Sequence, residues 1–141
     1  MSGSPELHGI GIPRLHHVAV VVADLDEAVA RYRQLGFRDE DRFVLAEQAV
    51  EVATFHSGGG WIELICPTDP EGPIARFLAK RGEGLHHVAY AVPDLAAALS
   101  QLAGAGLRLI DASPRTGAHG WRIAFIHPES CGGVLTELVE A

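Results

Sequence analysis

Two segments of this chain are alike, and this repetition restricts the possible folds more than any other feature of the sequence. LHHVAVVVADLDEAV begins at Leu15 and LHHVAYAVPDLAAAL begins at Leu85, and nine of the fifteen aligned positions are identical. The correspondence continues downstream, where IEL at 62–64 matches TEL at 136–138. We interpret the chain as a tandem duplication whose two halves fold in the same way.

Each half has the sequence signals of a strand, a helix and three further strands. The β-branched run 17–22 predicts a strand. Asp24 is then expected to cap a helix, with Glu27 completing a capping box and Gly36 ending the helix in a left-handed conformation. Asp94 and Gly106 repeat the arrangement. The remaining strands are expected at about 38–45, 50–57 and 61–66, and at about 107–111, 121–127 and 133–139, with a hairpin turn at 57–60.

The sequence therefore predicts an α+β fold of two tandem βαβββ modules that form a curved mixed sheet around a central cleft. Module 1 is expected at about 14–67 and module 2 at about 84–140. The linker between them, about 68–83, contains one short helix that begins at Pro73. Residues 1–13 are expected to form an N-terminal tail, and 14–141 a single domain.

Composition excludes several classes of function. A net charge of -7 argues against nucleic acid as a partner, because nucleic-acid binding requires a basic surface. No apolar run approaches the roughly 20 residues that cross a bilayer, so no membrane partner is expected. The N-terminus does not resemble a signal peptide. Cys66 and Cys131 are too few for a disulfide framework, which favours a reducing, cytoplasmic location.

Side-chain alternation along the first strand of each half places one histidine toward the cleft. His17 and the small Ala19 share a face that leaves room for a ligand, and His87 and Ala89 repeat this in the second half. The preceding histidine of each HH pair is expected to point away from the cleft.

Two glutamates lie at matched positions in the last strand of each half. Glu63 and Glu137 are each flanked by residues that face the opposite side of the strand. Burying a carboxylate without a partner costs several kcal/mol, and the duplication would require this cost twice. One divalent cation bound by His17, Glu63, His87 and Glu137 would remove both costs, making the cleft a metal cleft. This ligand set suits Co, Mn, Ni, Fe or Zn.

These features resemble the vicinal oxygen chelate (glyoxalase/bleomycin-resistance/dioxygenase) superfamily and, within it, the methylmalonyl-CoA epimerase family. The duplicated LHHVA and the His/Glu quartet carry the superfamily resemblance. The resemblance to the epimerase family rests on four segments: EQAV at 47–50, PIARFLAKRGEGLHHVAY at 73–90, RLIDASPRTGAHGWRIAFIHP at 108–128 and GGVLTELVE at 132–140. The resemblance covers about residues 14–140.

The resemblance implies a metal-dependent isomerase that interconverts (2R)- and (2S)-methylmalonyl-CoA. It implies an acyl-CoA substrate, removal of its α-proton with metal stabilisation of the developing enolate charge, and a homodimer. The family's metal ligands correspond to His17, Glu63, His87 and Glu137. Family members often carry Gln at the position of Glu63.

The resemblance leaves several candidates for the base. Val52 stands where some family members have a carboxylate that is proposed as the base, and the adjacent Glu51 should face the other side of its strand. Glu137 and Glu63 are the further candidates for catalysis. His127, Arg115 and Arg122 are the candidate substrate-binding residues, whereas Glu129 replaces a lysine that is common in the family.

Two other classes of function are compatible with the sequence. One is a different metal-dependent enzyme of the superfamily, such as a lactoylglutathione lyase or an extradiol dioxygenase. The dioxygenase typically uses two His and one Glu on iron, so the additional Glu63 argues against it. The other is a non-enzymatic module that sequesters a small drug in the same cleft, although such modules generally lack the metal quartet.

Overall fold

The structure is a computed structural model that describes residues 12–141, so the predicted N-terminal tail lies, through residue 11, outside the described residues. Contacts divide the chain into two compact units. One comprises residues 17–87, and the other combines the described residues before 17 with residues 88–141. The order of elements confirms the predicted βαβββ plan twice over, with a helix between the two copies.

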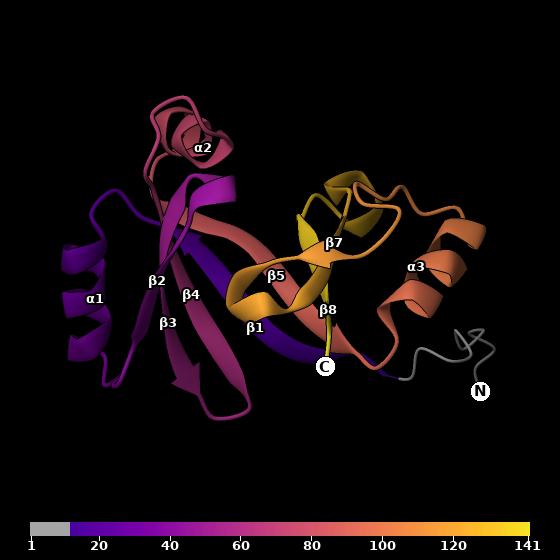
Figure 1. Ribbon diagram of the computed structural model, residues 1–141, viewed down its shortest axis with the longest axis horizontal. Coiled ribbons are helices and arrows are strands. Elements are labelled where there is room, and N and C mark those ends of the chain that lie inside the picture. The colour runs from indigo at the N-terminus through magenta and orange to yellow at the C-terminus, as the bar shows by residue number, and fades with distance from the viewer. Residues whose placement is uncertain (1–11) are drawn as a thin grey trace. The chain divides into compact units, whose positions relative to one another are not determined.

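The unit of residues 17–87 contains the first βαβββ module, drawn in indigo to magenta in Figure 1. The elements of the module are β1 (Arg14–Val21), whose residues before 17 are counted with the other unit, α1 (Leu25–Gln34), β2 (Asp41–Leu45), β3 (Val50–Ser57) and β4 (Gly60–Pro67), followed by α2 (Pro73–Arg81). The strands are ordered β2-β3-β4-β1. β1 pairs with β4 in parallel, whereas the β2–β3 and β3–β4 pairs are antiparallel.

The other unit repeats this plan with shorter strands at one edge. The elements of this second copy are β5 (Gly84–Val92), which belongs to this unit from residue 88 onward, α3 (Leu95–Gly104), β6 (Arg115–Thr116), β7 (Arg122–Ile126) and β8 (Thr136–Glu140). The strands are ordered β5-β8-β7-β6. β5 pairs with β8 in parallel, as β1 does with β4, and the other pairs are antiparallel.

The predicted strand at 107–111 is wrong. Leu109 forms a single bridge with Ile126, and the edge strand of this unit is the two-residue β6 instead. In a regular strand pair, the backbone N–H of Phe125 would donate to a carbonyl oxygen of the neighbouring strand. Here it donates to the Asp111 carboxylate at 2.8 Å. The Asp111 side chain thus takes the place of one backbone acceptor, and the segment keeps only irregular backbone bonds to this strand, such as that from the Ile110 N–H to the Phe125 carbonyl at 2.9 Å.

Both predicted helix caps are present. The Asp24 carboxylate accepts a hydrogen bond from the Glu27 N–H at 3.0 Å, and Asp94 accepts the equivalent bond in α3. Gly36 and Gly106 follow the two helices with φ of 107° and 90°, which residues with a Cβ rarely adopt. Among residues 12–141, no helix is long and apolar enough to cross a membrane.

Each main helix covers one face of the sheet in its own unit. Val22 and Leu64 pack with Leu25 and Val29 of α1, whereas Ala19 belongs to a separate cluster on the opposite face. In the other unit, Val92 and its neighbours pack against α3, and Ala89 lies in a separate cluster. The alternation predicted for the first strand of each module is confirmed. The face away from the helix is the one that carries His17 or His87.

We predict that Asp24→Ala and Asp94→Ala each lower the free energy of unfolding by about 1 kcal/mol, because each leaves a helix N–H without its acceptor. Urea unfolding monitored by circular dichroism measures the loss. Asp24→Asn and Asp94→Asn are the matched controls and should retain most of the stability. Alanine variants as stable as the parent would contradict the capping role.

Candidate metal centre

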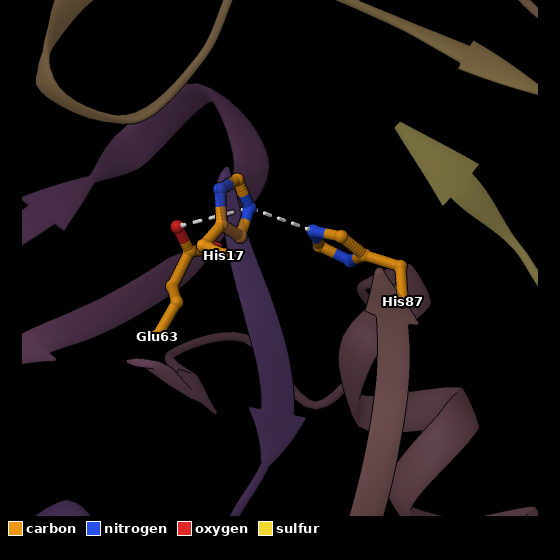
Figure 2. A group of neighbouring side chains, drawn as sticks. All are labelled: His17, Glu63 and His87. Carbon is orange, nitrogen blue, oxygen red and sulfur yellow. Dashed lines mark hydrogen bonds and ion pairs between the residues drawn. The ribbon is translucent and has the colours of Figure 1, made fainter. Parts of the chain in front are cut away.

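Three of the four predicted ligands converge within the unit of residues 17–87. Potential ligand atoms of His17, Glu63 and His87 all lie within 4.8 Å of one another. The two Nε2 atoms of His17 and His87 are 3.3 Å apart, and His17 Nε2 is 3.8 Å from Glu63 Oε2. Figure 2 shows the two imidazole rings turned toward each other, with the carboxylate beside His17.

Strand pairing explains how Glu63 reaches His17. In the parallel β1–β4 pair, Glu63 is the direct partner of Ala19, two residues after His17 on the same face of β1. Ala19 carries only a methyl group, so the longer side chains of His17 and Glu63 can turn toward each other above it. The sequence pattern H-x-A thus supplies both the candidate histidine ligand and the space that the carboxylate needs.

The other unit repeats this register around Glu137. In the parallel β5–β8 pair, Glu137 is the direct partner of Ala89, two residues after His87. All four side chains are buried, as the sequence predicted for the two glutamates, with exposed fractions of 2% for His17, 6% for Glu63, 3% for His87 and 4% for Glu137. In the described part of the chain, the other buried polar residues are threonines, Thr54 and Thr136.

Burial makes the His87 imidazole suitable as a neutral ligand. Desolvation lowers the pKa of His87 well below its ordinary value of 6.5, and the nearby His17 and His86 rings lower it further. At neutral pH the His87 ring is therefore uncharged, and one of its two nitrogens has a free lone pair. Metal ions bind imidazole in this form.

His86 has a contact with the site that strand alternation did not predict. Its Nδ1 atom lies 2.8 Å from Nδ1 of His87, although the two residues are neighbours on β5. The His86 ring also packs edge-on against Phe77 of α2, with 5.0 Å between ring centroids. Burial, and secondly the charge of Arg81, lower the pKa of His86. His16, its counterpart in the first repeat, packs edge-on against Trp121.

The three side chains fit a divalent cation. Ligand atoms about 2.0–2.2 Å from a common ion lie roughly 3 Å apart at right angles and at most about 4.4 Å apart. The 3.3 Å and 3.8 Å separations fall in this range. Two neutral nitrogens and a carboxylate oxygen are donors that first-row transition metals accept.

Glu51, a candidate base, lies on the opposite face of β3 from the metal ligands. Val52 packs in the cluster that contains Ala19, on the ligand face. The β3–β4 register is continuous, so Glu51 points the other way. There its carboxylate lies 3.4 Å from the guanidinium of Arg42, which also pairs with Asp26. Glu51 therefore forms a surface ion pair with Arg42.

The candidate substrate-binding residues lie in the other unit, each beside a partner. Arg115 donates to Asp111 at 3.1 Å and lies over the Phe125 ring, and Arg122 lies 3.7 Å from Glu140. His127 Nδ1 accepts from the Glu129 N–H at 3.0 Å and caps a short 3-10 turn. Exposed ion pairs contribute little to stability, so both arginines could exchange a carboxylate for an anionic ligand.

Known proteins share this fold and much of this sequence. Residues 16–125 match the Glyoxalase/Bleomycin resistance protein/Dioxygenase superfamily. The mitochondrial methylmalonyl-CoA epimerase of Homo sapiens is 38% identical over 91% of this chain and 74% of the human protein. The ethylmalonyl-CoA/methylmalonyl-CoA epimerase of Cereibacter sphaeroides is 37% identical over 90% and 97%. A structure of methylmalonyl-CoA epimerase in complex with methylmalonyl-CoA and NH4+ is 37% identical, with a TM-score of 0.84 over 92% of this chain and 94% of that one.

We predict that the metal-free protein becomes less stable as the pH falls below about 6.5, the ordinary histidine pKa. His87 takes up a proton in this range in the unfolded chain, whereas its pKa in the folded protein is lowered. The unfolded state then binds more protons, so the free energy of unfolding decreases as the pH falls. Urea unfolding between about pH 5 and pH 7 should show a shallower pH dependence for His87→Asn. Equal dependence in both proteins would contradict a neutral His87.

Proposed function

This chain belongs to the methylmalonyl-CoA epimerase family of the Glyoxalase/Bleomycin resistance protein/Dioxygenase superfamily, and we propose that it interconverts (2R)- and (2S)-methylmalonyl-CoA with a bound divalent metal ion. The observation that carries the proposal is the buried His17, Glu63 and His87 cluster, whose ligand atoms lie within 4.8 Å of one another. We propose Co, Mn, Ni, Fe or Zn as the metal. The homodimer and the cytoplasmic location stay predictions from the sequence.

We propose Glu137 as the fourth ligand on the basis of the duplication. It occupies the position in β8 that Glu63 occupies in β4, opposite an alanine two residues after a ligand histidine. It is also buried, with 4% of its surface exposed. A carboxylate is an oxygen donor that divalent first-row metals accept, so the cation proposed for Glu63 would also be able to bind Glu137.

The proposed reaction begins with removal of the proton between the thioester and the carboxylate of the substrate. When bound, the metal would act as a Lewis acid that stabilises negative charge developing on the thioester oxygen. The protein's part is to hold the ligands rigidly on paired strands and to exclude water by burying them. A preorganised, poorly solvated site interacts more strongly with developing charge than water does.

We propose a glutamate of the quartet as the base that moves the α-proton. A carboxylate has two oxygens, so one can bind the metal while the other accepts a proton. Glu137 is the preferred candidate, because the family often carries Gln at the position of Glu63 and an amide is not a base. Glu51 is not favoured, since it pairs with Arg42 on the other face of β3. Inversion of the α-carbon needs a proton delivered to the opposite face of the planar enolate, so either Glu63 acts as the second acid–base group there or Glu137 moves between the two faces.

Proton exchange tests the proposed activity directly. The purified protein, loaded with Co²⁺, is incubated with methylmalonyl-CoA in D₂O, and deuterium at the α-carbon is followed by mass spectrometry. We expect exchange well above the enzyme-free control, its loss on dialysis against EDTA and its recovery on adding Co²⁺. Ethylmalonyl-CoA, run in parallel, reports the acyl-chain preference. A metal-loaded protein that exchanges no faster than buffer would refute the proposal.

Variants of the carboxylates distinguish the candidate bases. We predict that Glu137→Gln slows exchange by roughly 10²–10⁴-fold, the usual contribution of a positioned general base. Glu63→Gln should lose less, because an amide oxygen still binds a metal. Glu51→Gln should retain activity, as should the surface control Glu129→Gln, whose parent residue pairs with Arg108. A loss in Glu51→Gln as large as that in Glu137→Gln would identify Glu51 as the base.

A further inference from the structure

We infer that His86 is a positioning residue for the metal centre, which holds the His87 ring in the tautomer that presents Nε2 to the ion. The inference rests on the metal site of the proposed function but concerns a residue outside the ligand quartet. Its basis is the Nδ1–Nδ1 separation of 2.8 Å between His86 and His87. This distance is typical of a hydrogen bond and requires one ring to donate and the other to accept.

The other nitrogen of His87 is already directed at the site. Its Nε2 faces His17 Nε2 at 3.3 Å, on the side where Glu63 also lies (Figure 2). If Nε2 is to bind a cation, its lone pair must be free, so the single proton of the neutral ring has to reside on Nδ1. The Nδ1–H of His87 then donates to Nδ1 of His86, and His86 carries its own proton on Nε2.

His86 is itself held in place by packing. Its ring lies edge-on to Phe77 of α2, with 5.0 Å between centroids, and the Arg81 guanidinium lies 5.4 Å from the centre of the same Phe77 ring. This arrangement fixes the position of the acceptor nitrogen relative to β5. A ligand histidine that donates its second N–H to a fixed acceptor loses less freedom when the metal binds, and it is also more basic.

His16, which corresponds to His86 in the first repeat, packs against a different aromatic residue. His16 packs edge-on against Trp121, with 4.4 Å between ring centroids. Both repeats contain the sequence HH, but its first histidine packs against Trp121 in the first repeat and against Phe77 in the second. The duplication accounts for the proposed ligands, whereas Phe77, which supports His86, belongs to α2, the helix between the two repeats.

Two substitutions at position 86 separate a hydrogen-bonding role from a packing role. His86→Phe keeps an aromatic ring against Phe77 but removes the acceptor. His86→Asn loses the ring but can place an amide oxygen near the position of the histidine Nδ1. The hydrogen bond predicts that Asn is the better replacement, and packing alone predicts that Phe is. His56→Phe is the matched control, because His56 is exposed at the end of β3 and packs against Trp61.

The measurement is Co²⁺ affinity by isothermal titration calorimetry on the full chain. We expect His86→Phe to bind Co²⁺ about 10–100-fold more weakly, the usual effect of removing such a partner. His86→Asn should recover most of this loss, and His56→Phe should match the parent. Long-range ¹H–¹⁵N NMR of the Zn²⁺-loaded protein should show the His87 proton on Nδ1. Parent-like affinity of His86→Phe, or weaker binding by His86→Asn than by His86→Phe, would overturn the inference.

A further variant distinguishes failure of this inference from failure of the metal site. His87→Ala should abolish tight Co²⁺ binding if His87 is a ligand. If His87→Ala binds as the parent does, the proposed metal centre is wrong, and the role of His86 falls with it. If His87→Ala loses binding while His86→Phe does not, the centre stands and the inference about His86 alone is refuted.

Discussion

In both repeats a parallel strand pair sets a glutamate opposite an alanine that follows a histidine by two residues. The pairs Ala19–Glu63 and Ala89–Glu137 come from β1–β4 and β5–β8, so the same register is made twice. A shift of one residue in either pair would turn the glutamate to the face that packs under the helix. The helices and the apolar clusters beneath them maintain this register. Each module therefore holds a buried histidine and a buried carboxylate on one face, which is the arrangement a cation stabilises.

The fold was largely predictable because its signals are local and occur twice. Asp24 and Asp94 cap helices as expected, and alternation correctly separated the helix-facing residues from His17 and His87. The error at 107–111 arose where a side chain, that of Asp111, took over a backbone hydrogen bond. Whether a side chain competes with a backbone acceptor depends on where the neighbouring strand lies, and the periodicity of the segment carries no information on that position. The β-rich pattern alone could not reveal it.

The grouping of His17, Glu63 and His87 was predictable from the sequence, but the neighbours of these side chains were not. Alternation places adjacent residues on opposite faces, so it predicted no contact between His86 and His87. The contact arises because both rings rotate about their side-chain bonds and because Phe77, in a different element, supports one of them. In contrast, the orientation of Glu51 followed from alternation alone, and its ion pair with Arg42 agrees with that expectation. The face of a strand on which a residue lies can be predicted from the sequence, whereas the rotation of its ring depends on packing against other elements.

The division of contacts between the two units has a consequence for the order in which the protein forms during synthesis. Residues 17–87 are continuous in the chain and make up one compact unit, so this part can fold before the remainder has left the ribosome. It already contains His17, Glu63 and His87. The described residues before 17 group with 88–141 instead, and they must wait for the rest of the polypeptide. The three side chains of the candidate metal site are therefore synthesised, within one compact unit, before Glu137 is added to the chain.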